Sequence, residues 1–219
     1  MQLRAFQATE GVFLVSSDPE LPPPYIGVVG SVHGNEPCGL HVIEGLRDPT
    51  HALRSRLTTG TLVLIHGNPE ATAQGTRHTR GGVDLNRLFE FRYLDDLPRE
   101  LWSYEHHRAL ELRPVLEALD GVLDLHSSTE PTQPFVITGE PRVKLGMKLD
   151  CPYVTYGWTA PGLLSDRVLI SPLLRLNRPA FSVECGQHGM SETHATAWRV
   201  AERYLEIMGA LTPSDALSG

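Results

Sequence analysis

Residues 25–36 read Tyr25-Ile-Gly-Val-Val-Gly-Ser-Val-His-Gly-Asn-Glu36, an apolar run followed at once by polar side chains. The first half is rich in β-branched residues and ends at Gly30, which is typical of a buried strand. The second half carries His33 and Glu36, with Gly34 between them to let the backbone bend tightly. Because ligands bind beyond the carboxyl ends of strands in open α/β sheets, this stretch predicts a functional site.

The same arrangement recurs three times along the chain. Apolar runs at 61–66, 121–125 and 180–183 lead into Gly67-Asn-Pro69, His126-Ser-Ser-Thr-Glu130 and Glu184-Cys-Gly-Gln-His188. Helical spacing of apolar residues is found at 36–46, 97–119 and 190–211, with Pro114 as a candidate kink or break, and 134–138 is a further predicted strand. This alternation predicts an α/β fold, and parallel strands would bring the four polar clusters together at one edge of the sheet.

The composition narrows the class of protein. The chain has 219 residues, of which 41% are hydrophobic and 21% charged, as in an ordinary globular protein, and we expect one domain over 1–219. The net charge of −7 argues against a nucleic-acid partner. No run is long enough for a membrane helix or a signal peptide, so we expect no membrane partner. Three widely spaced cysteines, Cys38, Cys151 and Cys185, fit reduced thiols and predict a cytoplasmic location.

Three of the strand-end residues have the chemistry of a catalytic zinc site. His33 and Glu36 have the spacing His-x-x-Glu, and His126 would supply a third ligand. Zinc in such a site acidifies water and polarises a carbonyl group, and Glu184 is placed to act as general base and then general acid. Each residue alone has a structural explanation, such as a strand-end histidine or a salt-bridged carboxylate. Their shared position at strand ends favours the metal site.

A basic stretch is conspicuous in this acidic chain: Arg77-His-Thr-Arg-Gly-Gly-Val-Asp-Leu-Asn-Arg87. Arginine forks bind carboxylates bidentately, and an asparagine adds a hydrogen bond. Arg77, Arg80, Asn86 and Arg87 therefore suit an anionic substrate or an oxyanion. The alternative is a solvated loop whose charges serve solubility. His188 is a further candidate for the site, whereas Cys38 and Cys185 fit small buried side chains better than metal ligands.

Taken in order, five segments resemble the succinylglutamate desuccinylase/aspartoacylase family, a branch of the zinc carboxypeptidase-like hydrolases. They are His33-Gly-Asn-Glu36, Gly67-Asn-Pro69, Asp84-Leu-Asn-Arg87, Asp124-Leu-His126 and Val183-Glu184, and the resemblance covers about residues 25 to 190. It implies a three-layer sandwich with a central mixed, largely parallel sheet. It also implies one catalytic zinc ion per chain, with His33, Glu36 and His126 as ligands and Glu184 as general base and acid.

The resemblance also assigns the basic stretch. Asn86 and Arg87 match the pair that holds the substrate carboxylate. Arg77 or Arg80 matches the arginine that stabilises the oxyanion, and Arg77 is favoured because Gly75-Thr-Arg77 precedes a ring residue, as in the family. The spacing to Asn86 is longer here, and Gly81-Gly82 is inserted. Better-known members carry a β-rich C-terminal domain that this chain is not expected to have. Candidates for the family's later substrate-binding Tyr and Arg are Tyr153, Tyr156, Arg167 and Arg175.

The function expected from this resemblance is hydrolysis of the amide bond of an N-acyl amino acid or a similar small amide that bears a carboxylate. Two alternatives stay open. One is a zinc carboxypeptidase or amidase that acts on peptide ends. The other is a metal-binding or ligand-sensing module without turnover. The expected partner is a small anionic amide, and a homo-oligomer is a further possibility, in which a second subunit would close the site.

Overall fold

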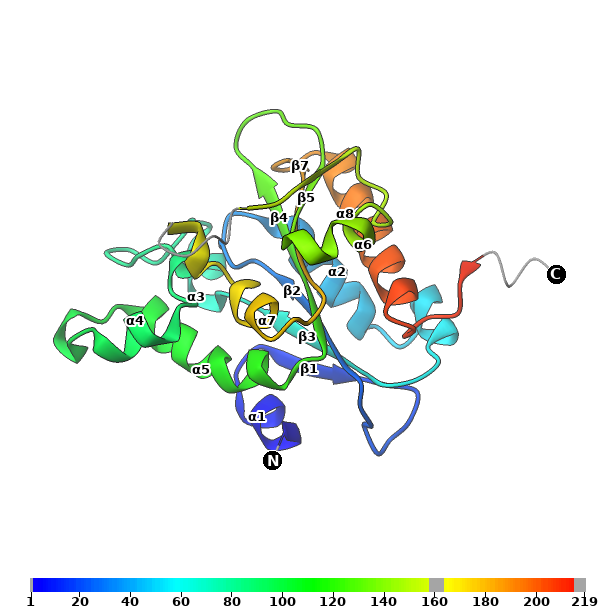
Figure 1. The fold of residues 1–219 in the computed structure, drawn as a ribbon, viewed down its shortest axis with the longest axis horizontal. Coiled ribbons are helices and arrows are strands. Elements are labelled where there is room, and N and C mark those ends of the chain that lie inside the picture. Colours follow the sequence, from blue (N-terminus) through cyan, green and yellow to red (C-terminus); the bar gives the residue numbers. More distant parts are fainter. Residues whose placement is uncertain (1, 158–163, 215–219) are drawn as a thin grey trace.

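The computed structural model describes residues 2–157 and 164–214, and a seven-stranded sheet forms its centre (Figure 1). The strand order is β1-β3-β2-β4-β7-β5-β6. The strands β3, β2, β4 and β7 run parallel, whereas β1 is antiparallel to β3 and β5 is antiparallel to β7. The predicted mixed, largely parallel sheet is confirmed. The strands are β1 (Val12–Val15), β2 (Tyr25–Gly30), β3 (Thr61–His66), β4 (Gly121–Ser128), β5 (Phe135–Ile137), β6 (Tyr153–Thr155) and β7 (Ala180–Gln187).

Helices cover both faces of the sheet, because the central strands are apolar on both sides. In β2, Ile26 and Val28 pack into one cluster, and Tyr25 and Val29 pack into the cluster on the opposite face. The first cluster is completed by α2 (Pro37–Arg47) and α8 (Ser191–Ile207). The second is completed by α1 (Gln2–Ala8), α5 (Tyr104–Ala118) and α7 (Ser171–Arg175). Three layers result, as expected (Figure 1).

The remaining helices are short. They are α3 (Pro69–Gln74), α4 (Phe91–Asp96) and α6 (Val143–Gly146), with 3₁₀ helices at Ala52–Arg56, Leu85–Arg87, Arg99–Leu101, Glu140–Arg142 and Leu164–Arg167. No helix in the described ranges is both long and apolar enough to cross a lipid bilayer.

The helix predicted at 97–119 begins later than expected. Residues Arg99–Leu101 form a separate 3₁₀ turn, and α5 starts after Ser103, whose side chain and His106 form a reciprocal capping box. The helix then continues through Pro114 instead of breaking there. Burial of Leu112 and Val115 on either side of the proline holds both halves against the sheet.

Two of the parallel strands are longer than their apolar runs. β4 extends through His126 to Ser128, and β7 extends through Glu184 to Gln187. His126 and Glu184 are register partners on these neighbouring strands, and an irregularity in the pairing follows His126. Hydrogen bonds between β4 and β7 therefore fix the backbone of the polar residues at the carboxyl ends of these two strands.

Candidate metal centre and active site

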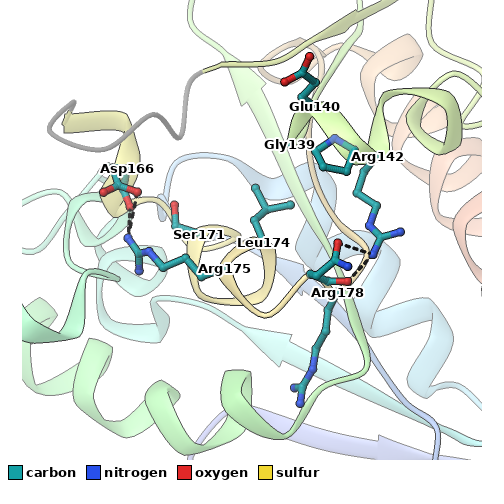
Figure 2. Close-up of a pocket in the computed structure, with 10 residues that line it drawn as sticks. Gly139, Glu140, Arg142, Asp166, Ser171, Leu174, Arg175 and Arg178 are labelled. Atoms are coloured by element: carbon teal, nitrogen blue, oxygen red, sulfur yellow. Dashed lines mark hydrogen bonds and ion pairs between the residues drawn. The ribbon is translucent and has the colours of Figure 1, made fainter.

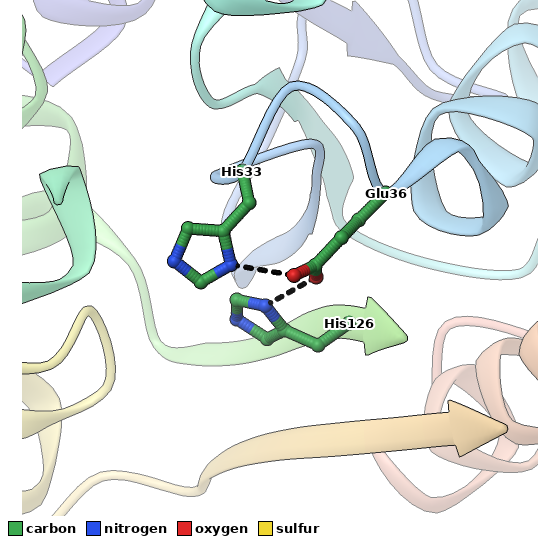
Figure 3. Close-up of side chains that lie close together, drawn as sticks. All are labelled: His33, Glu36 and His126. Carbon is green, nitrogen blue, oxygen red and sulfur yellow. Dashed lines mark hydrogen bonds and ion pairs between the residues drawn. The ribbon is translucent and has the colours of Figure 1, made fainter. Parts of the chain in front are cut away.

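His33, Glu36 and His126 come together at the carboxyl ends of β2 and β4, as predicted. One ligand atom from each lies within 4.8 Å of the others, and all three side chains are buried. Nδ1 of His33 is 2.8 Å from Oε1 of Glu36, and Nδ1 of His126 is 2.9 Å from Oε2 (Figure 3). Both imidazoles thus turn the same type of nitrogen toward one carboxylate.

Gly34 makes the His-x-x-Glu bend possible, for a reason that the sequence does not reveal. Its φ is not in the left-handed region, but a Cβ atom there would lie 2.1 Å from the main-chain carbon of Ala71. The backbone of α3 therefore packs directly against this bend. A side chain at residue 34 would therefore force either this bend or the backbone of α3 to move.

A second carboxylate stands behind each imidazole. Nε2 of His33 lies 3.0 Å from Oδ1 of Asp84, and Nε2 of His126 lies 2.7 Å from Oδ2 of Asp124. The Ser182 hydroxyl donates to the same Asp124 oxygen at 3.0 Å. Carboxylates in this position fix the orientation and tautomer of metal-ligating histidines. Two Nδ1 atoms and one carboxylate form the donor set that zinc prefers, so these residues fit a zinc ion.

The electrostatics of the centre follow from these contacts. Burial opposes ionisation of Glu36, but the adjacent His126 and His33 lower its pKa well below the ordinary value, so it is a carboxylate at neutral pH. Burial lowers the pKa of His126, but Asp124 and Glu36 together raise it well above the ordinary value for histidine. The carboxylates around these two imidazoles thus favour positive charge at this centre.

A pocket of about 130 Å³ opens over this centre. Glu184 enters it from β7, and the Ser128 hydroxyl donates to its Oε2 at 3.1 Å. The other lining residues are His33, Arg77, Asn86, Arg87, His126, Ile137, Val168 and Ser182. The predicted base, two of the three metal-site residues and three of the four basic-stretch candidates therefore share one cavity.

The structure separates the two candidate arginines. Arg77 lines the pocket, donates to Oδ2 of Asp84 at 2.9 Å and lies 3.5 Å from Oε1 of Glu36. Arg80 does not line this pocket: it borders an open hollow formed by residues 74 and 76–81, and Arg77 borders both. Its main-chain N–H donates to the Gln74 side chain at 3.1 Å. The geometry favours Arg77 as the arginine that faces a reacting group.

Asn86 and Arg87 lie in the 3₁₀ helix Leu85–Arg87 on the wall of the pocket. Oδ1 of Asn86 accepts the main-chain N–H of Leu169 at 2.8 Å, which leaves its amide nitrogen as a donor. Arg87 donates through one guanidinium nitrogen to the main-chain oxygen of Asn86 at 2.8 Å. The pair therefore presents hydrogen-bond donors, as a carboxylate ligand requires.

Other residues singled out in the sequence lie elsewhere. His188 bonds to the Ser127 hydroxyl at 2.8 Å and does not line the pocket. The four Tyr and Arg candidates do not line the pocket either. Tyr153 and Tyr156 are exposed to solvent. Arg167 stacks on a tyrosine ring, and Arg175 forms an ion pair with an aspartate. Four residues at or beside the site were not predicted to have a role there: Asp84, Ile137, Val168 and Ser182. Only Asp84 had a signal in the sequence, since it begins the segment Asp84-Leu-Asn-Arg87.

A larger cavity, of about 230 Å³, lies between the 3₁₀ helix Glu140–Arg142 and α7 (Figure 2). Its three arginines are all engaged: Arg142 with Asn177, Arg175 with Asp166, and Arg178 with two main-chain oxygens at the end of α5. It has no residue in common with the pocket over the metal centre. The smaller pocket is therefore the candidate active site.

Comparisons with known proteins identify the family to which the chain is similar. A family model described as the succinylglutamate desuccinylase/aspartoacylase catalytic domain matches residues 23–149. An N-acyl-aromatic-L-amino acid amidohydrolase of Rattus norvegicus is 33% identical over 114 residues, which are 49% of this chain and 34% of that protein. An aspartoacylase of Mus musculus is 32% identical over 111 residues, 48% of this chain and 34% of that protein. The match thus spans about a third of the length of these curated relatives.

Solved structures extend the likeness to the fold of nearly the whole chain. The product-bound ectoine utilization protein of Ruegeria pomeroyi superposes with a TM-score of 0.73 at 20% identity. The superposition covers 93% of this chain and 62% of that one. This likeness confirms the predicted three-layer fold, and its coverage extends beyond residue 149, where the match to the family model ends.

Proposed function

Because the chain belongs to the succinylglutamate desuccinylase/aspartoacylase family, we propose that it is a zinc-dependent hydrolase that deacylates a small N-acyl amino acid. The observation that carries this proposal is one pocket that joins Glu184, Arg77, Asn86 and Arg87 to the metal-type centre. The relatives named as amidohydrolase and aspartoacylase support the reaction class.

His33, Glu36 and His126 are the residues that would hold the zinc ion. When bound there, zinc would polarise the amide carbonyl and make a water molecule more acidic. The chain's own residues supply the rest of the chemistry. Asn86 and Arg87 hold the substrate carboxylate with N–H donors, and this fixes the position of the amide bond over the centre.

Proton transfer falls to Glu184. Its carboxylate takes a proton from water as the oxygen attacks the amide carbon, and it returns that proton to the leaving nitrogen as the carbon–nitrogen bond breaks. Arg77 faces the same space and stabilises the negative charge on the former carbonyl oxygen. One such donor typically contributes about 3 kcal/mol to transition-state stabilisation. The products are a carboxylate and a free amino acid.

The size of the pocket supports a small substrate over a peptide end. Its volume of about 130 Å³ is below the usual range for drug-sized ligands. Ile137 and Val168 are its apolar walls and suit a short acyl group or an apolar side chain. The odd number and wide spacing of the cysteines Cys38, Cys151 and Cys185 support a cytoplasmic location. The single-domain organisation and a homo-oligomeric state stay predictions.

Amine release from a panel of N-acyl amino acids tests the proposal. Zinc-loaded protein is incubated with acetyl, succinyl and longer acyl derivatives, with C-terminal dipeptides alongside. We expect release from at least one acyl amino acid. We expect Glu184→Gln to lower turnover about 100- to 10,000-fold while retaining one zinc ion per chain, because it removes the base but no ligand.

Glu140→Gln serves as the matched control, since Glu140 lies in the other cavity and should leave turnover unchanged. Full activity of Glu184→Gln would remove that residue from the mechanism. Cleavage of dipeptides alone would identify a carboxypeptidase, and silence on both substrate classes would reject the proposed reaction.

A further inference from the structure

Glu105 is a fully buried carboxylate outside the pocket and has an unusual number of partners. It lies in the first turn of α5 and has no exposed surface. Its Oε1 accepts the main-chain N–H of Thr79 at 2.7 Å and the side-chain amide of Asn68 at 3.4 Å. Its Oε2 accepts the Thr79 hydroxyl at 3.1 Å, the main-chain N–H of Val83 at 3.3 Å and the Ser103 hydroxyl at 3.0 Å.

These contacts hold a tight turn over residues 79–82. The N–H of Gly82 donates to the main-chain oxygen of Thr79 at 2.9 Å, and Gly81 has a φ of 77°, as the third residue of a type II turn requires. A Cβ atom on Gly82 would lie 2.1 Å from Oε2 of Glu105. Gly81 therefore permits the turn, and the missing side chain of Gly82 leaves the space that the Glu105 carboxylate occupies.

The turn lies between two groups of pocket residues. Arg77 precedes it by two residues, and Asp84 follows Val83 directly and leads into Asn86 and Arg87. The main-chain oxygen of Arg77 also accepts the N–H of Gly34, and Asp84 contacts both His33 and Arg77. A shift of the turn would move the arginine and the carboxylate-binding pair together.

We propose that Glu105 is a positioning residue: by fixing the turn 79–82, it sets Arg77 toward the metal centre, leaves Arg80 outside the pocket and places Asn86 and Arg87 on its wall. Its effect on catalysis rests on the proposed function, whereas its effect on the loop does not. Glu105 itself does not line the pocket. It acts through the loop and takes no part in the chemistry.

The variant Glu105→Gln tests this role with little change in volume. The glutamine keeps one oxygen, which can accept the hydrogen bonds that one carboxylate oxygen of Glu105 accepts. Its NH₂ group then faces the main-chain N–H of either Thr79 or Val83, and two donors cannot form a hydrogen bond with each other. Hydrogen–deuterium exchange of the zinc-loaded protein is the first measurement. We expect peptides over 76–87 to exchange about tenfold faster or more, with β2, β3 and the rest of α5 unchanged. Glu117→Gln, an exposed carboxylate change on the same helix, is the matched control.

Faster exchange along the whole chain would show a general stabilising residue and overturn the proposal, as would unchanged exchange at 76–87. If Glu105→Gln does not fold, Gly82→Ala replaces it, because its Cβ atom displaces the same carboxylate. These results are read independently of turnover, so a failed substrate panel does not affect them.

Kinetics then test the coupling to Arg77 on the best substrate of the panel. We expect Glu105→Gln to lower kcat about tenfold or more and to raise KM, while Glu117→Gln changes neither. In an Arg77→Ala background, the further loss of kcat should be less than about threefold, because both changes remove the same interaction. Full additivity of the two losses would show that Glu105 does not act through Arg77 and would overturn the proposal even if the reaction is confirmed.

Discussion

The orientation of His33 and His126 depends on two carboxylates that are not themselves proposed metal ligands. Asp84 and Asp124 each bond to the Nε2 atom that faces away from Glu36. An ionised carboxylate in this position keeps a proton on Nε2 and leaves Nδ1 free to bind a cation. At the scale of single residues, the candidate site therefore combines three proposed ligands with two carboxylates that orient them.

We expect Asp124→Asn to weaken zinc binding about 10- to 100-fold. The amide can turn its NH₂ group toward Nε2 of His126, which favours the tautomer that carries the proton on Nδ1 and cannot bind the metal. Competition with a chromogenic zinc chelator measures the affinity. Asp95→Asn, at an exposed carboxylate, is the control. Equal affinity in the two variants would show that Asp124 does not set the tautomer.

Individual site residues were predictable where they directly follow an apolar run that predicts a strand. His33, Glu36, His126 and Glu184 all follow apolar runs, and the structure brings them to one edge of the sheet. Arg77 was favoured over Arg80 only through the resemblance carried by Gly75-Thr-Arg77, and the structure places Arg77 but not Arg80 on the pocket wall. Ile137 and Val168 line the pocket through tertiary packing, which leaves no local pattern in the sequence.

At the scale of elements, Arg108 joins α5 to the carboxyl end of β3. Its buried guanidinium donates to main-chain oxygens of Glu10, His66 and Gly67 at 2.8–2.9 Å. The main-chain oxygens at the end of β3 thus accept hydrogen bonds from a charged side chain of α5, the helix that also carries Glu105. This contact places a fixed positive charge next to His66.

Burial and the nearby Arg108 lower the pKa of His66 to about 4 from an ordinary value of 6.5. As the pH falls through this window, the unfolded chain takes up a proton that the folded chain does not, so stability is lost with acidification. Because His66 is only partly buried, solvent screening reduces the expected loss between pH 7 and 4.5 to about 1–2 kcal/mol. We expect His66→Gln to lose less stability over this range than the parent protein, as measured by urea unfolding at both pH values.

His107→Gln, on an exposed position of α5, should retain the full pH dependence of the parent protein. If His66→Gln and His107→Gln lose equal stability on acidification, the burial of neutral His66 does not contribute to the acid sensitivity.

The central strands and the long helices were predictable because their apolar runs are continuous or periodic. β2 and β3 have the predicted bounds, and α2 and α8 lie within a residue or a few residues of theirs. The short edge strands β1 and β6 were missed, since four and three residues with one pairing partner leave a weak pattern. Pro114 misled because tertiary packing of α5 outweighs the local cost of proline in a helix.

On the scale of the whole molecule, the two hydrophobic clusters share the strands of one sheet. Alternate residues of β2, β3, β4 and β7 enter opposite clusters, so neither helix layer has a core that is separate from the sheet. The metal-site residues lie at the edge of these same strands. Unfolding of one layer would expose the sheet and remove the support of the other layer and of the site.

We therefore expect one cooperative unfolding transition seen equally from both layers. Trp198 stacks on His51 beside the cluster of α2 and α8, and Trp102 packs against the cluster of α5. With Trp158 replaced by phenylalanine in both, two variants that retain only Trp102 or only Trp198 should show the same fluorescence midpoint in urea. Zinc at one hundred times the dissociation constant should raise the free energy of unfolding by about 3 kcal/mol, because it binds only the folded sheet edge, and should therefore shift both midpoints equally. A midpoint that differs between the two tryptophans, or a zinc effect confined to one, would show that the layers unfold separately.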